Sequence, residues 1–454
     1  MTEQSNIRDL TAEQKDFAIY LPAMCKPYMT GTTKDRRAAA SMGESWKMDY
    51  YKPGALFEYK WMLYSAGHAS LDADSDLKYE SMVHERDRNN TFLLADSGGF
   101  QIGKGRWKGK WNDPKDKVAE KMREKVFGWL DRVGDYSMIL DIPSWTFRDP
   151  EVAEKVGIYS FNDAITGTKF NNDYFVANQT KDSMFMNVLQ GNTEDEVLYW
   201  YEQVKNYPFR GWAFGGQVAR DLKIMLDIFV RLTYDGLLER GERDWVHVLG
   251  ATRMHWGVAL TKIMRVLREK VNPDLTISLD SASPFLSTVN AGIYTGVNTE
   301  DRTRWNIFTE RAVDDKKYRG DTTNIAENYE YFLRNPVSDH LTLGDICYTD
   351  DERKSSWDVQ SYVFIMANNI WQHINAIQES NRRADAGFYT APLINENFTR
   401  VTINDVVDEI FSKNTKEDSL AVVEKHANFL RSIPVGGQTK VSATPMFENL
   451  FEYS

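Results

Sequence analysis

The sequence contains very little cysteine and no long hydrophobic run. Two cysteines among 454 residues, Cys25 and Cys347, exclude a disulfide framework and favour a reducing compartment. No stretch approaches the roughly 18 consecutive apolar residues of a membrane span, and the opening residues MTEQSNIRDL are polar without an apolar core. Secretion and membrane insertion are therefore not supported, and the sequence predicts a cytoplasmic protein.

Positive charge is also scarce. The 55 Lys and Arg residues are outnumbered by 66 Asp and Glu residues, which leaves a formal net charge of −11. This balance argues against indiscriminate coating of nucleic acid, although a local basic patch can still hold a phosphate backbone. Aromatic residues are abundant, with 13 Trp, 22 Tyr and 23 Phe. So much aromatic surface must be buried, which excludes a disordered chain.

Short apolar runs alternate with amphipathic segments over much of the chain. Each run ends in a small or acidic residue and is too short for a core helix, so the runs predict buried parallel strands with helices between them. Such βα units form a closed barrel or an open sheet, and the absence of a G-x-G-x-x-G fingerprint favours the barrel. The predicted strands are 61–68, 91–99, 137–144, 183–191, 211–217, 245–252 and 275–283.

The pattern changes after about residue 285. Residues 300–335 are polar and charged, residues 356–383 predict a long helix, and the tail contains further helical stretches. We therefore expect an α/β fold, a (β/α)8 TIM barrel with insertions over residues 1–383, followed by a mainly helical C-terminal extension over residues 384–454. The sequence leaves open whether this extension is an appendage or part of the outer layer of the barrel, and it leaves the oligomeric state open.

Polar residues and glycines follow the predicted strands, where a β/α barrel builds its active site. An acidic residue after a strand is most often the N-cap of the next helix. Helix capping is less able to explain three carboxylates at one set of strand ends, because they stand beside glycines that expose backbone N–H groups. Carboxylates at such positions suit glycosyl chemistry, with one as nucleophile and another as acid/base. The residues are Asp96, Asp141, Gln190, Gly215, Gly216, Gly250 and Asp280.

Six motifs at these positions resemble the guanine transglycosylase family, whose best-known members exchange guanine for a 7-deazaguanine in tRNA. DSGGFQ is highly specific, whereas the others are individually weak. Their order and spacing over about residues 55–380 are those of the family, and this ordered combination carries the resemblance. The motifs are DSGGFQ (96–101), LDIP (140–143), VLQG (188–191), FGGQV (214–218), HVLGA (247–251) and SLDSASP (278–284).

The resemblance implies a role for each matching residue. Asp280 becomes the nucleophile that attacks C1′ of the target nucleoside and expels guanine. Asp96 becomes the acid/base residue. The base would lie among Phe100, Asp141, Gln190, Gly215, Gly216, Leu249 and Gly250.

Within this base pocket, the residue types fit guanine independently of the resemblance. Asp141 would accept the N1 and N2 hydrogens, while Gln190 and the backbone N–H of Gly216 would meet the O6 side. Phe100 would stack on the purine, and Leu249 with its neighbouring glycine would form a wall. Core packing of Phe100 and Leu249 and a tight turn at the glycine pair are the simpler explanations of the same residues.

Two departures from the tRNA enzymes bear on the substrate and on zinc. Those enzymes follow the nucleophile with an arginine-bearing segment that holds the anticodon, whereas residues 281–296 contain no Arg or Lys. The zinc motif of the family, C-x-C-x-x-C with a later His, keeps only Cys347 and His373. One structural zinc is possible if Asp345 or His340 substitutes for the missing thiolates, and otherwise His373 is a core residue on a helix face.

A basic segment, GKGRWKGKW (103–111), follows DSGGFQ directly. Its cations suit phosphate groups, and its indoles can stack on unpaired bases, so it is a candidate nucleic-acid-binding segment. A solvated, flexible hairpin is the simpler alternative. The candidate residues are Lys104, Arg106, Trp107, Lys108, Lys110 and Trp111.

With these departures and its extended C-terminal tail, the chain most resembles the DNA-guanine transglycosylases of the DpdA type, which are found in phages and in bacterial DNA-modification clusters. The resemblance implies exchange of guanine in DNA for 7-cyano-7-deazaguanine or a relative through a covalent Asp-glycosyl intermediate, in the host cytoplasm if the protein is phage-encoded. Two alternatives stay open, a queuine-type tRNA-guanine transglycosylase and a non-catalytic nucleic-acid-binding subunit of one. Retention of Asp96 and Asp280 speaks against the second, because a binding subunit has no need of the pair.

Overall fold

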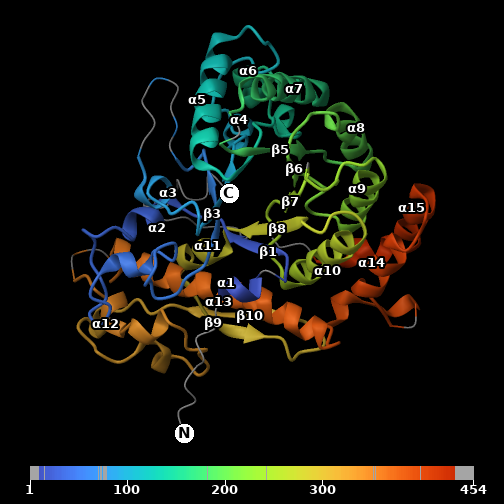
Figure 1. Cartoon of the computed structure of the whole chain (residues 1–454). Helices are drawn as coiled ribbons and strands as arrows, with labels where there is room; N and C mark the ends of the chain where they lie inside the picture. The colour runs from blue at the N-terminus through green and yellow to red at the C-terminus, as the bar shows by residue number, and fades with distance from the viewer. Residues whose placement is uncertain are drawn as a thin grey trace.

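Eight parallel strands form the central sheet of the computed structural model (Figure 1). They are β1 (Ile19–Pro22), β2 (Trp61–Ser65), β3 (Phe92–Asp96), β4 (Tyr136–Met138), β5 (Met184–Leu189), β6 (Gly211–Phe214), β7 (Trp245–Val248) and β8 (Thr276–Ser281). From β2 to β8 each strand pairs with the next along the chain, and β1 pairs with β8. A parallel bridge between Ala23 and Leu63 joins the two edges, so the predicted (β/α)8 TIM barrel is confirmed.

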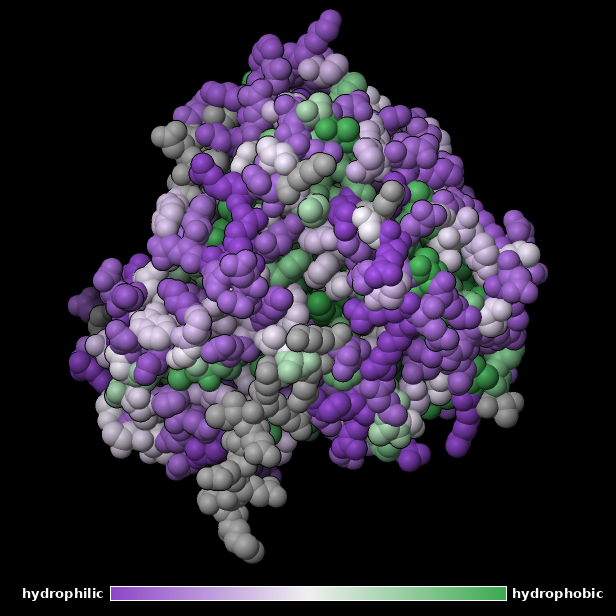
Figure 2. Space-filling model, in the orientation of Figure 1, coloured by the Kyte–Doolittle hydropathy of each residue, from purple (hydrophilic) through white to green (hydrophobic). Residues whose placement is uncertain are grey.

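The structure describes residues 10–14, 16–69, 71, 74, 79–180, 182–241, 243–350, 352, 354–398 and 400–434. Residues 1–9 of the predicted barrel domain and 435–454 of the predicted extension lie outside this description. Within the described ranges, no helix is both long and apolar enough to cross a membrane. The face of the molecule in Figure 2 is mostly hydrophilic, and hydrophobic residues show there only in small, separate areas.

Helices cover the outside of the barrel, and in Figure 1 those from residue 117 to residue 270 curve round the strands. Several begin at a side chain that accepts hydrogen bonds from free backbone N–H groups, as Asp116, Thr193 and Asp221 do. The helices up to the end of the barrel are α1 (Leu10–Gln14), α2 (Lys26–Gly31), α3 (Ser81–His84), α4 (Phe100–Gly103), α5 (Lys117–Val133), α6 (Pro150–Val156), α7 (Phe161–Asn178), α8 (Glu194–Val204), α9 (Leu222–Tyr234), α10 (Met254–Lys270), α11 (Ser283–Val289), α12 (Leu343–Ile346) and α13 (Val359–Asp385).

The sequence predicts seven of the eight strands and misses β1. This strand lies within the apolar run FAIYLPAMC (17–25), but Pro22 interrupts the run, and a proline inside an apolar run argues against a buried strand. The sequence also misses the antiparallel hairpin of β9 (Gly292–Asn298) and β10 (Asn306–Arg311). The second half of β10 is exposed and charged, which is why it reads as a polar, irregular segment.

The C-terminal extension packs on the barrel as far as residue 434. Its helices α14 (Ile403–Phe411), α15 (Lys416–Lys425) and α16 (Ala427–Ser432) lie against α9 and α10, and a short hairpin of β11 (Ile394–Asn395) and β12 (Val401–Thr402) precedes them. Tyr234 donates to the carbonyl of Lys413 at 2.8 Å, and Trp256 Nε1 donates to the carbonyl of Pro434 at 3.0 Å. The described part of the extension therefore belongs to the outer layer rather than forming an appendage.

Candidate active site

The carboxyl ends of the barrel strands carry the predicted polar residues. Asp96 is the last residue of β3, and Asp280 is the penultimate residue of β8. Asp141, Gln190 and Gly215 follow β4, β5 and β6. Because the strands are parallel, their carboxyl ends lie on one face of the barrel, where barrel enzymes have their active sites. The structure therefore brings the predicted carboxylates to one face.

Asp96 is held through one carboxylate oxygen. Ser65 lies opposite Asp96 in the register of β2 and β3 and donates from Oγ to Oδ2 at 2.5 Å. The N–H of Gly98 reaches the same oxygen at 3.3 Å, whereas no described residue donates to Oδ1. Burial raises the pKa of Asp96, the Ser65 hydrogen bond lowers it, and the charge of Asp280 raises it again. A raised pKa suits a carboxyl group that donates and then recovers a proton.

Asp280 is also held through one oxygen. Its Oδ1 accepts from the N–H of Gly250 at 2.6 Å and lies 3.2 Å from Nε2 of His247. Its Oδ2 accepts no hydrogen bond from the described residues. Gly250 has a φ of 68°, a conformation that a side chain disfavours, and this turn directs its N–H to the carboxylate. Gly250 therefore anchors Asp280, a role that the sequence does not predict.

Asp141 and Gln190 form a buried pair. Gln190 donates from Nε2 to Oδ2 of Asp141 at 2.8 Å. Burial raises the pKa of Asp141 to about 7, while the hydrogen bond from Gln190 lowers it less. A Cβ on Gly99 would lie 2.4 Å from the carbonyl oxygen of Asp141, and one on Gly215 would lie 2.9 Å from Nε2 of Gln190. Glycine at both positions therefore lets the backbone approach the pair closely.

Phe100 and Trp145 are half-buried and pack beside the exposed Lys104. The Phe100 and Trp145 rings pack edge to face with centroids 5.7 Å apart. The Nζ atom of Lys104 lies 5.1 Å from the Phe100 centroid and 5.7 Å from that of Trp145. Leu249 is half-buried and packs against the hydrophobic core. Neither Phe100 nor Leu249 is a fully buried core residue, so both are accessible in part.

The cations of the basic segment differ in their surroundings. Lys104 and Lys108 are exposed. Arg106 donates to Oε1 of Gln101 at 3.5 Å. Lys110 forms an ion pair with Glu154 at 3.3 Å and also donates to its carbonyl oxygen. Lys104 and Lys108 are therefore the cations of this segment best placed to meet a phosphate group.

The two indoles of the segment also differ. Trp107 is half-buried, and its ring would lie 2.9 Å from a Cβ on Gly98, so it packs on the loop that follows Asp96. Trp111 is fully buried, and its Nε1 donates to the carbonyl of Trp107 at 3.1 Å. The prediction that Trp111 can stack on a base is therefore wrong, because its ring is part of the core.

The residues proposed for zinc do not come together as a metal site. Within the part of the chain that the structure describes, no group of three or more His, Cys, Asp or Glu side chains could hold a metal ion. Cys347 donates to the carbonyl of Val313 at 3.6 Å, and Thr342 and Asp345 cap α12. His373 is buried and stacked on Tyr20, with centroids 4.7 Å apart. The interpretation of His373 as a core residue fits this arrangement, and the residues present do not fit a four-ligand zinc site.

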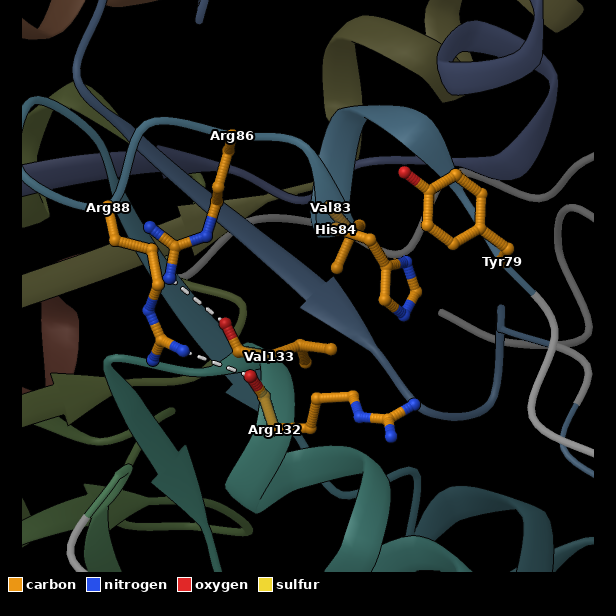
Figure 3. Close-up of a pocket in the computed structure, with 7 residues that line it drawn as sticks. All are labelled: Tyr79, Val83, His84, Arg86, Arg88, Arg132 and Val133. Carbon is orange, nitrogen blue, oxygen red and sulfur yellow. Dashed lines mark hydrogen bonds between the residues drawn. The ribbon is translucent and has the colours of Figure 1, made fainter.

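A cavity of about 300 Å³ lies at the opposite end of the barrel (Figure 3). Arg86 donates to the carbonyl of Val133 and Arg88 to that of Arg132, both at 3.0 Å. These residues precede β3 and β4 and so lie at the amino ends of the strands, the face opposite to the one where barrel enzymes have their active sites. The arginines therefore hold the end of α5 rather than contribute to the candidate active site. The cavity is lined by Tyr79, Val83, His84, Arg86, Arg88, Arg132 and Val133.

The sequence does not single out Ser65, Trp145 or His247 as site residues. Ser65 reaches Asp96 only because β2 and β3 are neighbours in that register. Trp145 reaches Phe100 from the loop after β4. His247 carries a weak signal, because it is the one polar residue in the apolar run WVHVLG (245–250).

No protein-family model matches the chain. No curated protein matches it either. The fold and the strand ends define a (β/α)8 barrel protein whose candidate active site contains three carboxylates, and the reaction is inferred from those residues themselves.

Proposed function

We propose that this chain is a DNA-guanine transglycosylase, which exchanges guanine in DNA for a 7-deazaguanine base such as 7-cyano-7-deazaguanine. One observation carries the proposal. Asp96 and Asp280 sit at the same end of the barrel, each with one oxygen held by neighbouring groups and one that accepts no hydrogen bond from the described residues. This is the arrangement that a nucleophile and an acid/base residue need for two successive displacements at one carbon.

The reaction proceeds in two halves. In the first, Oδ2 of Asp280 forms a bond to C1′ while the bond from C1′ to N9 breaks, and Asp96 gives a proton to the departing guanine. In the second, the incoming base gives its N9 proton to Asp96 and attacks C1′, and Asp280 leaves as a carboxylate. Two inversions at C1′ retain the β configuration and produce ping-pong kinetics.

Asp141 and Gln190 would recognise the base. Ionised Asp141 accepts the two hydrogens of the guanine edge, and the second N–H of Gln190 with the N–H of Gly216 faces O6. Phe100 supplies an aromatic surface for the purine ring. Guanine and 7-deazaguanines share this edge, so one pocket serves both the departing and the incoming base.

DNA is favoured over tRNA by two features of the chain. Residues 281–296 contain no Arg or Lys to hold an anticodon, and exposed Lys104 and Lys108 follow the loop of Asp96. A target deoxyguanosine must leave the base stack before its C1′ can meet a carboxylate at a barrel mouth. Both cysteines are buried and unpaired, which fits the proposed cytoplasmic location.

The test combines covalent trapping with nucleoside analysis. Without an incoming base, the protein should form a denaturation-resistant adduct with guanine-containing DNA, and Asp280→Asn should abolish it. Asp418→Asn is a matched control, because Asp418 is an exposed carboxylate in α15 of the outer layer, where it accepts a hydrogen bond from Thr415. Mass spectrometry of nucleosides from cells expressing the protein should find a 7-deazaguanine in DNA. Its appearance only in tRNA would favour the queuine-type alternative, and its absence from both would contradict the proposal.

A further inference from the structure

A chain of polar contacts inside the barrel ends on the candidate nucleophile. Trp245 and His247 are two residues apart on β7, and Ser278 and Asp280 are two apart on β8, so each pair shares one face of its strand. All four side chains are buried. Trp245 Nε1 donates to Ser278 Oγ at 2.8 Å, and that Oγ lies 2.8 Å from His247 Nδ1. The Nε2 atom of His247 then lies 3.2 Å from Oδ1 of Asp280.

The direction of these hydrogen bonds follows from the indole. An indole N–H can only donate, so Ser278 accepts from Trp245 and keeps its own hydroxyl hydrogen for another partner. Among the described residues, Nδ1 of His247 is the remaining hydrogen-bonding neighbour of this hydroxyl. When Ser278 donates to Nδ1, the imidazole hydrogen lies on Nε2.

The other protonation states of His247 fit the surroundings less well. With the hydrogen on Nδ1, a bare Nε2 lone pair would face a carboxylate oxygen of Asp280. With both nitrogens protonated, the hydroxyl hydrogen of Ser278 would have no acceptor within the described ranges. Within the described ranges Nε2 forms no hydrogen bond, and Oδ1 of Asp280 lies 3.2 Å from it, so an N–H at Nε2 faces this carboxylate oxygen.

We infer that His247 is a positioning residue for Asp280, and this inference rests on the proposed transglycosylase function. The N–H of Gly250 holds Oδ1 at 2.6 Å and Nε2 of His247 faces the same oxygen at 3.2 Å, so Oδ2 is the oxygen that attacks C1′. When the ester bond breaks in the second half of the reaction, the carboxylate charge returns and both donors stabilise it. His247 acts through Asp280, from inside the barrel, and does not contact the substrate.

Two variants separate this role from a packing role. His247→Phe keeps an aromatic ring and removes the donor, and the rate of adduct formation should fall on the order of 10- to 100-fold. His247→Gln keeps an N–H near the position of Nε2 and should recover most of this loss. The affinity for free base should stay unchanged in both. His255→Phe is the matched control, because His255 is also a buried imidazole, stacked on Trp305 in another part of the fold.

The position of the imidazole hydrogen on His247 can be tested without measuring the transglycosylation reaction. In the full chain labelled with [15N]histidine, seven imidazoles are present, and the signal lost in His247→Gln identifies the relevant ring. We expect a protonated Nε2 and a bare Nδ1, with the Nε2 resonance moved by Asp280→Asn. A protonated Nδ1, or equal losses of base affinity and adduct formation in His247→Phe, would overturn the inference. If the wild-type chain forms no adduct at all, the proposed function fails, and the nitrogen resonances still decide whether His247 donates to Asp280.

Discussion

Gln190 donates from Nε2 to Oδ2 of Asp141 at 2.8 Å, so the two buried side chains form one polar unit behind the strand ends. The pKa of Asp141 is unusual for a carboxyl group, because burial raises it to about 7. Asp141 therefore changes charge close to neutral pH. Both base recognition and folding stability should respond to that change, in opposite directions.

Base binding should strengthen as the pH rises through about 7. In the proposed base pocket, ionised Asp141 would accept the hydrogens of the guanine edge, whereas the protonated acid would place its own hydrogen against a guanine N–H. Below pH 7, affinity for 7-cyano-7-deazaguanine should fall by up to about tenfold per pH unit. Calorimetric titrations from about pH 5 to 9 measure this dependence, and Asp141→Asn should lose both the affinity and its pH dependence. Constant affinity across that range would contradict the assigned role of Asp141.

Folding stability should change in the opposite sense. The pKa of Asp141 is higher in the folded state than in the unfolded state, so its stabilising contribution is full below about pH 4 and is lost as pH rises through about 7. In Asp141→Asn the side chain stays neutral, so the free energy of unfolding no longer falls for this reason as the pH rises. At pH 8 the variant should be more stable to urea than the wild type by on the order of 1–4 kcal/mol, with the gain vanishing towards pH 4. A variant less stable than the wild type at pH 8 would show that the carboxylate stabilises the fold.

DNA affinity should depend on salt through the exposed lysines of the basic segment. Lys104→Ala and Lys108→Ala should each reduce the slope of log affinity against log salt by roughly 0.7–0.9. Lys110→Ala should have a smaller effect, because Lys110 is already paired with Glu154. Lys117→Ala on α5 is a matched control, because this side chain is exposed and paired with Glu120 outside the segment. Fluorescence anisotropy at several salt concentrations gives the slopes, and unchanged slopes in the first two variants would remove the segment from the interface.

The two tryptophans of the basic segment should give different phenotypes. Trp111→Ala leaves a cavity in the core and should destabilise the protein by about 3–5 kcal/mol. Trp107→Ala should destabilise it less and weaken binding of single-stranded DNA, by about 1–3 kcal/mol if a base stacks on this indole. Urea unfolding and DNA titration of both variants make the comparison. Equal unfolding midpoints for both would contradict the assignment of Trp111 to the core.

The parts of the fold that the sequence predicts are those with a local pattern. The runs at 91–99 and 183–191 indicate β3 and β5 because strands buried on both faces are continuously apolar. Asp96 and Asp280 are predictable for the same reason, since they stand at the ends of such runs. β1 ends in Pro22, which argues against a buried strand, and it is defined by its pairing with β8.

The contacts that complete the site depend on which strands are neighbours. In the sequence, nothing distinguishes Ser65 from other strand residues, and only the register of β2 and β3 places it opposite Asp96. His247 becomes significant only when β8 brings Ser278 and Asp280 beside it. The alternation of cations and indoles likewise cannot show which indole turns inward, and so the sequence assigns Trp107 and Trp111 the same role.

Closure of the barrel has a consequence for the order of events during synthesis. β1 pairs with β8, and the bridge from Ala23 to Leu63 completes the ring. A nascent chain that ends before β8 has an open sheet with an unpaired edge on β1 and on β7, and such edges are prone to wrong pairing. Asp280 is made with the strand that closes this gap. Of the three carboxylates at the strand ends, Asp280, the proposed nucleophile, is therefore made last, and a chain that ends before β8 has neither a closed barrel nor this residue.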